Sequence, residues 1–470
     1  MSEASPHGKV IKMYAAREEV YPREAKGRYA TLRWVCVWIT QLVFYGLPWF
    51  NFNGRQAVLF DLGARKFYIF GLVLWPQDFI YLAALLIISA FLLFLVTAMA
   101  GRLWCGFACP QTVYTEIFMW IERHIEGARS ARIRLDRQPW SASKLARKSA
   151  KHAAWGAVAL ITGFTFVGYF APMRSLLEAM ASLSLGPWEW FWIGFYAFAT
   201  YGNAGWMREQ VCKYMCPYAR FQSAMFDKDT LIVSYDVRRG EPRGPAGASA
   251  SRAATAATVP KGDCIDCTLC VQVCPTGIDI RNGLQYECIG CAACVDACNG
   301  VMDKIDLARG LIRFTSEQGL DQGWNARQIA SRVLRPRVLV YVALLAAIVA
   351  AFAISLVMRT PLMVDIIRDR GSMGREVGDG LIENVYRLQV MNTAEKAHSF
   401  EVRVSGLPGL AVDGGDLVQV DAASTRAVPL RIQVPRASLA KGSHTIEVQL
   451  VATDDPSLLV QEKAVFIIPQ

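Results

Sequence analysis

Two groups of cysteines in the second half of the chain have the spacing of iron–sulfur ligands. The first run is C-I-D-C-T-L-C-V-Q-V-C-P and the second is C-I-G-C-A-A-C-V-D-A-C-N, so both follow C-x2-C-x2-C-x3-C. In proteins that hold two cubane clusters, three cysteines of each run bind one cluster and the fourth binds the other. The sequence therefore predicts two 4Fe–4S clusters, bound by a first quartet (Cys264, Cys267, Cys270 and Cys298) and a second quartet (Cys288, Cys291, Cys294 and Cys274).

Zinc is the alternative occupant of these cysteines. Tetrahedral zinc sites usually take cysteines in separated pairs, whereas here two quartets are packed into one short stretch, so iron–sulfur clusters are favoured. Thiolate ligands and cluster insertion need a reducing compartment. We therefore expect this segment to lie in the cytoplasm.

A second pattern, C-x3-C-P, occurs twice before the quartets. If each pair lies on one helix, its cysteines share a face with Cβ atoms ~5–6 Å apart. A disulfide needs about 3.8 Å between Cβ atoms, so such a pair suits a soft ion such as Cu(I) better. The alternative is that these cysteines merely pack. We take them as candidate catalytic and copper-binding residues and call them the four-thiol site: Cys105, Cys109, Cys212 and Cys216.

The composition is that of a membrane protein, with 53% hydrophobic residues. Five apolar runs are candidate transmembrane helices, and the two C-x3-C-P motifs follow the second and the fourth. An amphipathic piece within 51–77 is expected to lie along the interface or to re-enter the membrane. The expected spans are 34–50, 79–100, 153–172, 188–206 and 338–357.

The basic residues predict the orientation. Nine Lys or Arg lie between Arg123 and Lys151, whereas the loop at 173–187 carries only Arg174. Cytoplasmic loops are enriched in Lys and Arg, so the N-terminus, the loop at 123–151 and the clusters are expected inside. The formal net charge of +10 is explained by these loops, and no nucleic-acid partner is expected.

The last 110 residues differ from the rest. Period-two runs such as H-T-I-E-V-Q-L-V, separated by Gly, Pro, Asn and Asp, predict an immunoglobulin-like β-sandwich outside the cytoplasm. His398, His444 and Cys36 are interpreted as ordinary surface or core residues. The expected organisation is a cytoplasmic segment (1–33), a four-helix membrane region with two hairpins (34–229), an extended piece and flexible linker (230–261), a two-cluster ferredoxin domain (262–310), a connector (311–337), a fifth membrane helix (338–357) and the β-domain (360–470).

These motifs together resemble one family, the cytochrome c oxidase accessory proteins called CcoG, also known as FixG or RdxA. The matching stretches are R-K-F-Y-I-F-G, W-P-Q-D-F, W-C-G-F-A-C-P-Q-T-V-Y, V-C-K-Y-M-C-P-Y-A-R-F-Q-S-A-M-F-D, S-Y-D-V-R-R-G-E-P-R-G, both cluster motifs, C-N-G-V-M-D-K-I and E-N-V-Y-R-L-Q-V-M-N. They extend from about residue 65 into the C-terminal domain.

The resemblance implies a multi-pass protein of the bacterial inner membrane, with the ferredoxin domain in the cytoplasm and the β-domain in the periplasm. It further implies a role in assembling cbb3-type oxidase, with reduction of Cu(II) to Cu(I) for insertion. The implied partners are oxidase assembly factors, copper chaperones or transporters, and an unidentified electron donor.

Two other functions are compatible with the same residues. One is a respiratory relay similar to the membrane ferredoxins of nitrate or nitrous-oxide reduction, which share C-x3-C-P hairpins and paired clusters. The fifth span and the external β-domain distinguish this chain from the nitrate-type relay. The other is a redox-sensing scaffold, which would show no copper-dependent electron transfer.

Overall fold

Three long apolar helices are prominent in the computed structural model, which describes residues 19–244, 262–369, 374–378, 380–413, 417–436 and 440–469. They are α1 (Arg28–Gly46), α2 (Phe79–Ala100) and α15 (Pro336–Val357). Short 3-10 turns, η1 (Leu47–Trp49) and η2 (Pro76–Asp78), extend α1 and α2. Within the described residues, these three are the helices whose length and composition suit a membrane span. Most of the N-terminal segment and the low-complexity linker at 245–261 lie outside the described residues.

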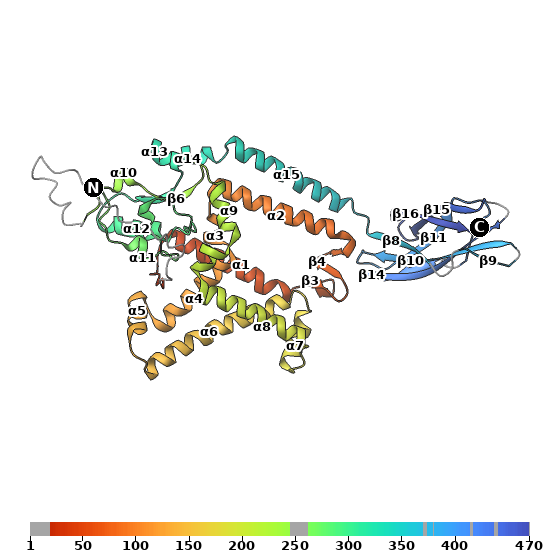
Figure 1. Cartoon of the computed structure of the whole chain (residues 1–470), viewed down its shortest axis with the longest axis horizontal. Coiled ribbons are helices and arrows are strands. Elements are labelled where there is room, and N and C mark those ends of the chain that lie inside the picture. The colour runs from red at the N-terminus through yellow and green to blue at the C-terminus, as the bar shows by residue number, and fades with distance from the viewer. Residues whose placement is uncertain are drawn as a thin grey trace, which may run out of the picture. The chain divides into compact units, whose positions relative to one another are not determined.

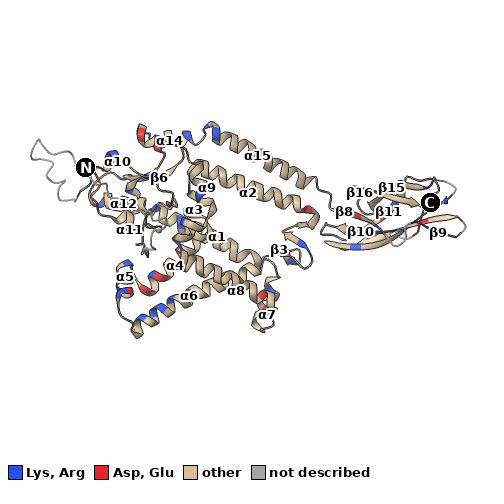
Figure 2. Ribbon diagram, viewed as in Figure 1, with Lys and Arg blue, Asp and Glu red and all other residues tan. Residues whose placement is uncertain are grey.

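The other two expected spans are also helical. Residues 142–167 form α6 (Ala142–Val167), and residues 187–207 form α8 (Pro187–Tyr201) followed by a π-helix, η3 (Gly202–Met207). α6 and α8 pack so closely that a Cβ atom on Gly163 would lie 2.4 Å from the backbone oxygen of Ile193. Basic residues occupy the first turns of α6 and much of α5 (Arg129–Arg137), as Figure 2 shows. That α6 and α8 cross the membrane stays a prediction.

The chain divides into two compact units. The first comprises residues 1–47, 88–167 and 178–345, and the second comprises 48–87, 168–177 and 346–470. All twelve predicted ligand cysteines belong to the first unit, which also contains α1, α6 and α8 (Figure 1). Its other helices include α3 (Leu103–Phe107), α4 (Pro110–Glu126), η4 (Val211–Met215), α9 (Pro217–Met225), α13 (Glu317–Gln322) and α14 (Ala326–Arg332). The division of the chain between residues 177 and 178 falls within α7 (Met173–Ala181).

The cysteine-rich domain is closed by a two-stranded antiparallel ladder. β6 (Ile232–Tyr235) precedes the linker and pairs with β7 (Ile312–Thr315), which follows the second quartet. The extended piece before the linker is therefore part of this domain's sheet. Between the strands lie α10 (Val237–Gly240), α11 (Leu269–Gln272), η6 (Ile280–Asn282) and α12 (Ala293–Lys304).

The second unit contains a small sheet that the sequence did not suggest. Two strands, β1 (Asn51–Phe52) and β2 (Arg55–Gln56), form one hairpin, and the sheet β3-β4-β5 is antiparallel. The expected interfacial or re-entrant amphipathic piece is thus strand and turn: β3 (Val58–Asp61), β4 (Lys66–Ile69) and β5 (Leu72–Leu74). The K-F-Y-I run has aromatic and β-branched residues that favour strands, and Arg65 adopts the positive φ of a tight turn.

The C-terminal residues form the expected two-sheet sandwich. One sheet has the order β12-β14-β10-β8, with β9 on β10, and the other has the order β13-β11-β15-β16. Their inward residues form one core that includes Tyr386, Phe400 and Phe466. The strands are β8 (Leu362–Arg368), β9 (Arg375–Val377), β10 (Leu381–Asn392), β11 (His398–Ser405), β12 (Ala411–Asp413), β13 (Leu417–Val420), β14 (Ser424–Pro435), β15 (Gly442–Ala452) and β16 (Leu459–Ile468).

An aspartate at the start of α2 binds an arginine at the end of α15 within the second unit. Asp78 accepts hydrogen bonds from Arg359 and, at 2.9 Å, from the backbone N–H of Trp75. Arg359 also donates to the carbonyl of Val73 at 3.2 Å. Both side chains are buried, 9% exposed for Arg359 and 3% for Asp78, so neither charge has solvent as an alternative partner.

We expect Asp78→Asn to lower the free energy of unfolding by about 3–5 kcal/mol, because it leaves Arg359 buried without a counter-charge. Chemical denaturation of the purified protein in detergent measures this. The matched control is Asp413→Asn, whose exposed pairing with Arg431 at 3.7 Å should contribute less than about 1 kcal/mol. Equal losses in both variants would contradict a structural role for the buried pair.

Candidate iron–sulfur and thiol site

The first quartet surrounds one cavity. Cys264 and Cys267 lie on the loop before α11, Cys270 lies on α11, and Cys298 is contributed by α12. All four line the same cavity, together with Tyr235 of β6 and apolar residues of the domain core. The structure thus brings the distant Cys298 to the three cysteines with which the sequence grouped it.

The second quartet surrounds a neighbouring cavity. Cys274, Cys288, Cys291 and Cys294 all line it. The loop can turn tightly between these cysteines because Gly290 and Ala292 adopt left-handed backbone conformations, with φ of 67° and 58°. α12 contributes Cys294 to this cavity and Cys298 to the other, so a single helix fixes the spacing between the two cavities.

Both cavities have the chemistry that 4Fe–4S clusters require. Burial raises the pKa of Cys298 and of Cys288 to about 12, so these thiols become anions only if a bound cation compensates them. Backbone N–H groups already donate to the sulfurs: Gly290 to Cys288 and Ile312 to Cys298. Such N–H···S bonds are among the features that set cluster potentials. The two quartets are therefore suited to hold the predicted clusters.

Zinc is the alternative occupant of the quartets. Tetrahedral zinc needs four ligands about 2.3 Å from one point. In the described parts of the chain, no three Cys, His, Asp or Glu side chains approach closely enough to hold a single metal ion. A cubane cluster is larger than an ion and accepts wider sulfur spacing.

The C-x3-C-P pairs do not lie on continuous helices, and that expectation was wrong. Cys105 is on α3, but Cys109 is the extended residue before α4, with φ −60° and ψ 129°. Cys212 is on the π-helix η4, and Cys216 is the extended residue before α9, with φ −77° and ψ 110°. The cause is the proline, which favours the first position of a helix and drives the preceding residue to extended conformations.

The four thiols nevertheless lie close enough to one another to interact electrostatically. Cys105 interacts electrostatically with Cys109 and Cys216, and Cys212 interacts with Cys105, Cys109 and Cys216. Burial raises the pKa of Cys105 to about 11 and that of Cys212 to about 12. Gln222 is completely buried, and its side-chain oxygen lies 3.4 Å from the sulfur of Cys105.

The four-thiol site lies directly against the second quartet. Cys105 and Cys212 pack on an apolar cluster that includes Val273, Ile289 and Cys291. The two backbones touch at Gly106, where a Cβ atom would lie 2.8 Å from the backbone nitrogen of Cys291. The glycine of W-C-G-F is therefore required by this contact.

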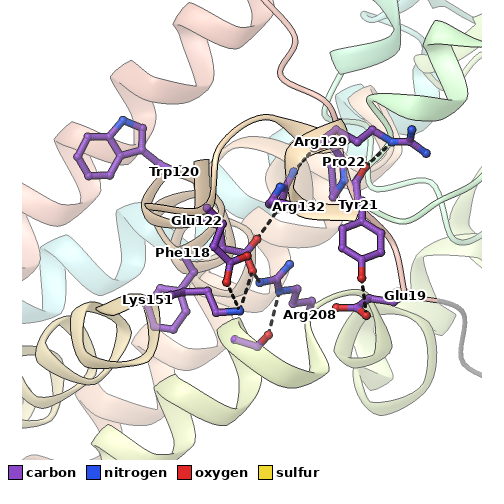
Figure 3. A network of polar contacts seen from close by, with 12 residues as sticks. Glu19, Tyr21, Pro22, Phe118, Trp120, Glu122, Arg129, Arg132, Lys151 and Arg208 are labelled. Carbon is purple, nitrogen blue, oxygen red and sulfur yellow. Dashed lines mark hydrogen bonds and ion pairs between the residues drawn. The ribbon is translucent and has the colours of Figure 1, made fainter. Parts of the chain in front are cut away.

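A buried ion-pair network fixes the turn that leads to Cys212. Arg208 has a left-handed φ of 38°, unusual for a residue with a side chain. Its guanidinium donates to Glu122 at 2.5 Å and to the carbonyl of Gly205 at 2.9 Å. Figure 3 shows Arg132 and Lys151 converging on the same carboxylate, at 2.8 and 3.9 Å. Three cations from different elements thus share one buried glutamate.

A residue next to the first C-x3-C-P motif is hydrogen-bonded to the turn that precedes the second motif. Gln111, which follows the proline of the first motif, donates its side-chain amide to the carbonyls of Asn203 at 2.8 Å and of Arg208 at 3.2 Å. The break between η3 and η4 is therefore bound from α4. Rare π-helical turns of this kind are frequent at functional sites.

A buried carboxylate joins the cluster domain to the first apolar helix. Asp296, which lies on α12 between one cysteine of each quartet, accepts from the backbone N–H groups of Ala30 at 2.7 Å and Tyr29 at 3.3 Å. These are free donors in the first turn of α1. Gly27 has no side chain with which to cap the helix, and a Cβ atom there would overlap Asp296 at 2.4 Å.

Sequence reasoning missed Arg102, Gln222 and Asp296. Arg102 follows an uninterrupted apolar helix, where a basic residue is normally interpreted as an interfacial anchor. Asp296 and Gln222 sit inside recognised motifs, but nothing in their spacing shows that they are buried. The available signal for Asp296 was its place between two ligand cysteines.

We expect Cys274→Ser to damage the second cluster and to leave the first intact, although Cys274 follows the first-quartet cysteines in sequence. The reason is that Cys274 lines the second cavity. Electron paramagnetic resonance of the anaerobically purified variant, with iron analysis, measures this, and Cys298→Ser is the matched control with the opposite outcome. Loss of the first signal in Cys274→Ser would refute the assignment.

Comparisons with known proteins agree with this chemistry. Residues 207–317 match a family described as a 4Fe-4S dicluster domain, and residues 82–127 match one described as a 4Fe-4S binding domain. The only cysteines within residues 82–127 are Cys105 and Cys109. Residues 352–469 match a family described as an IG-like fold at the C-terminal of FixG.

Whole-length relatives match almost the entire chain. The Nitrogen fixation protein FixG of Rhizobium meliloti is 38% identical over 485 residues, covering 95% of this chain and 91% of that protein. Protein RdxA and Protein RdxB of Cereibacter sphaeroides are each 38% identical, covering 91% and 87% of this chain and 91% and 86% of those proteins. The chain therefore belongs to the FixG family of membrane iron–sulfur proteins that transfer electrons.

Proposed function

We propose that this protein reduces Cu(II) to Cu(I) at the four-thiol site and supplies the product to a cbb3-type oxidase during assembly. The observation that carries this proposal is the convergence of the two C-x3-C-P pairs next to the second quartet. A thiol site beside an electron-transfer cofactor is the arrangement that reduction of a soft metal requires.

The chemistry needs one electron per copper ion. Bound 4Fe–4S clusters supply single electrons, which is the number that converts Cu(II) to Cu(I). Thiolates favour Cu(I) over harder divalent ions, so the four-thiol site would stabilise the product. A pair of thiols suffices for this role, consistent with the lack, in the described residues, of any three ligands close enough to share one ion.

The protein environment prepares the site for an anionic ligand set. Burial raises the pKa of Cys105 and of Cys212, so these two thiols become thiolates only when copper displaces their protons. Gln222 lies against Cys105, and Gln111 and Glu122 hold the turn before Cys212. Gln222, Gln111 and Glu122 thus help to fix the positions of the thiols.

The first test changes the thiols. Replacing Cys105 and Cys109, or Cys212 and Cys216, with serine should abolish Cu(I) binding, measured by competition with a chromophoric chelator, and copper-stimulated oxidation of the dithionite-reduced protein. Both cluster signals should remain, because their ligands lie elsewhere. Cys36→Ser is the matched control, since Cys36 lies on α1 outside both thiol sets.

Iron analysis separates this proposal from its alternatives. Two clusters correspond to about eight iron per chain. About twelve iron, with about four lost in the paired serine variants, would instead assign the four thiols to a third cluster. Normal copper binding and reduction in these variants would make the pairs structural and leave the respiratory relay as the better function. Absence of copper-dependent electron transfer in the parent would favour the redox-sensing scaffold.

The proposed partners and location follow from the same arrangement. We place the protein in the bacterial inner membrane, with clusters in the cytoplasm, where an electron donor reduces them. The β-domain would face the periplasm, where oxidase assembly factors and copper chaperones or transporters act. Copper is the substrate, and the lipid bilayer surrounds the apolar faces of α1, α2 and α15.

Reporter fusions test the topology. Fusions after residues 140 and 300 should report the cytoplasm, and fusions after residue 180 and at residue 470 should report the periplasm. The physical basis is the excess of Lys and Arg between Arg123 and Lys151. A cytoplasmic C-terminus would mean an even number of spans and would remove the periplasmic role of the β-domain.

A further inference from the structure

A buried arginine lies where the four-thiol site meets the second quartet. Arg102 immediately precedes α3 and is 5% exposed. One terminal nitrogen donates to the carbonyl of Ala219, while its Nε has no hydrogen-bond partner in the structure. Among the described ion pairs, none joins Arg102 to an Asp or Glu. An uncompensated buried guanidinium is costly. The counter-charge of Arg102 must therefore come from a neighbouring group that becomes negatively charged.

Besides the carbonyl of Ala219, Arg102 has three cysteines within electrostatic range. Its charge interacts with Cys105 and Cys212 of the four-thiol site and with Cys288 of the second quartet. The backbone of Arg102 also lies next to the loop of the second quartet, since a Cβ atom on Gly290 would lie 3.2 Å from the carbonyl oxygen of Arg102. One cation therefore faces ligands of both predicted metal centres.

The other arginines beside cluster cysteines differ in having carboxylate partners. Arg281, which interacts with Cys270 of the first quartet, pairs with Asp279 at 2.7 Å and also with Asp266. Arg33, which interacts with Cys291, lies 3.7 Å from Glu116. Carboxylates thus offset the charge near the first quartet and part of the charge near the second. Arg102 is left to balance the sulfur ligands themselves.

We propose that Arg102 is a positioning residue that supplies the shared counter-charge of the four-thiol site and the second cluster. Adding one electron to either centre adds one negative charge, and a fixed neighbouring cation stabilises that reduced form. Arg102 thereby raises the potential of the second cluster and strengthens retention of Cu(I). The copper part rests on the proposed function; the cluster part does not.

The experiment compares Arg102→Gln and Arg102→Lys with the parent, using anaerobically purified full-length protein. Iron content, redox titration followed by electron paramagnetic resonance, and Cu(I) competition are measured on each. We expect Arg102→Gln to keep its iron, to lower the midpoint potential of the second cluster and to weaken Cu(I) binding by about tenfold, because a charge-assisted contact is lost. Arg102→Lys keeps the charge and should stay close to the parent in both measurements.

Arg281→Gln is the matched control. It removes an arginine beside the first quartet, so it should alter only the first cluster's signal, with the signals assigned through Cys274→Ser. An unchanged second midpoint in an iron-replete Arg102→Gln protein would overturn the proposal. If Arg102→Gln loses iron, the Arg102→Lys variant decides the question. Iron content, second-cluster midpoint potential and Cu(I) affinity equal to those of the parent would support a role for the positive charge. A clear change in any of the three would overturn the proposal.

The copper and cluster measurements separate the two proposals. A parent protein that does not bind Cu(I) would remove the proposed copper chemistry, while the midpoint comparison would still test Arg102. A parent that binds Cu(I) with an affinity unaffected by Arg102→Gln would keep the copper site and exclude Arg102 from it.

Discussion

The contact of Gly106 with the Gly290–Cys291 peptide is the constraint on which the redox region depends. Two backbones approach there without a side chain between them, since a Cβ atom would lie 2.8 Å from both residues. This contact places Cys105 against the loop of the second quartet and sets Arg102 beside Cys288. The fold therefore joins a motif that follows an apolar helix to a motif in the cluster domain through main-chain atoms, which permit little adjustment.

Ion pairs between different segments are a second feature of the first unit. Glu122 is buried and pairs with Arg208, Arg132 and Lys151. Asp227, which is partly exposed, pairs with Arg335 at 2.9 Å and with Arg337 at 3.1 Å. Each of these five cations is paired with a carboxylate from another segment of the chain. Such pairs add little net stability, but removal of one partner is costly, so they specify how the short helices join. Arg102 differs from these cations because no carboxylate is paired with it among the described residues.

Local spacing made the quartets predictable, because three cysteines of each set lie within seven residues and the motif repeats. Reasoning from local spacing was wrong at the C-x3-C-P motifs. It assumed one continuous helix through each motif, whereas the proline after the second cysteine begins a new helix. The β3-β4-β5 sheet was missed because its short strands follow a candidate span and share its apolar composition. Arg102 and Asp296 depend on contacts over more than one hundred residues, which no pattern along the chain expresses.

Asp296 has a consequence for the order in which the protein is made. The carboxylate that completes the first turn of α1 lies 266 residues further along the chain than Ala30. Until that part of the chain has been made, the leading amide groups of α1 must therefore rely on other partners such as water. They gain their permanent partner only after the cysteine-rich segment has been translated and has folded. Folding of the cysteine-rich segment thus also completes the hydrogen bonding of the first turn of α1.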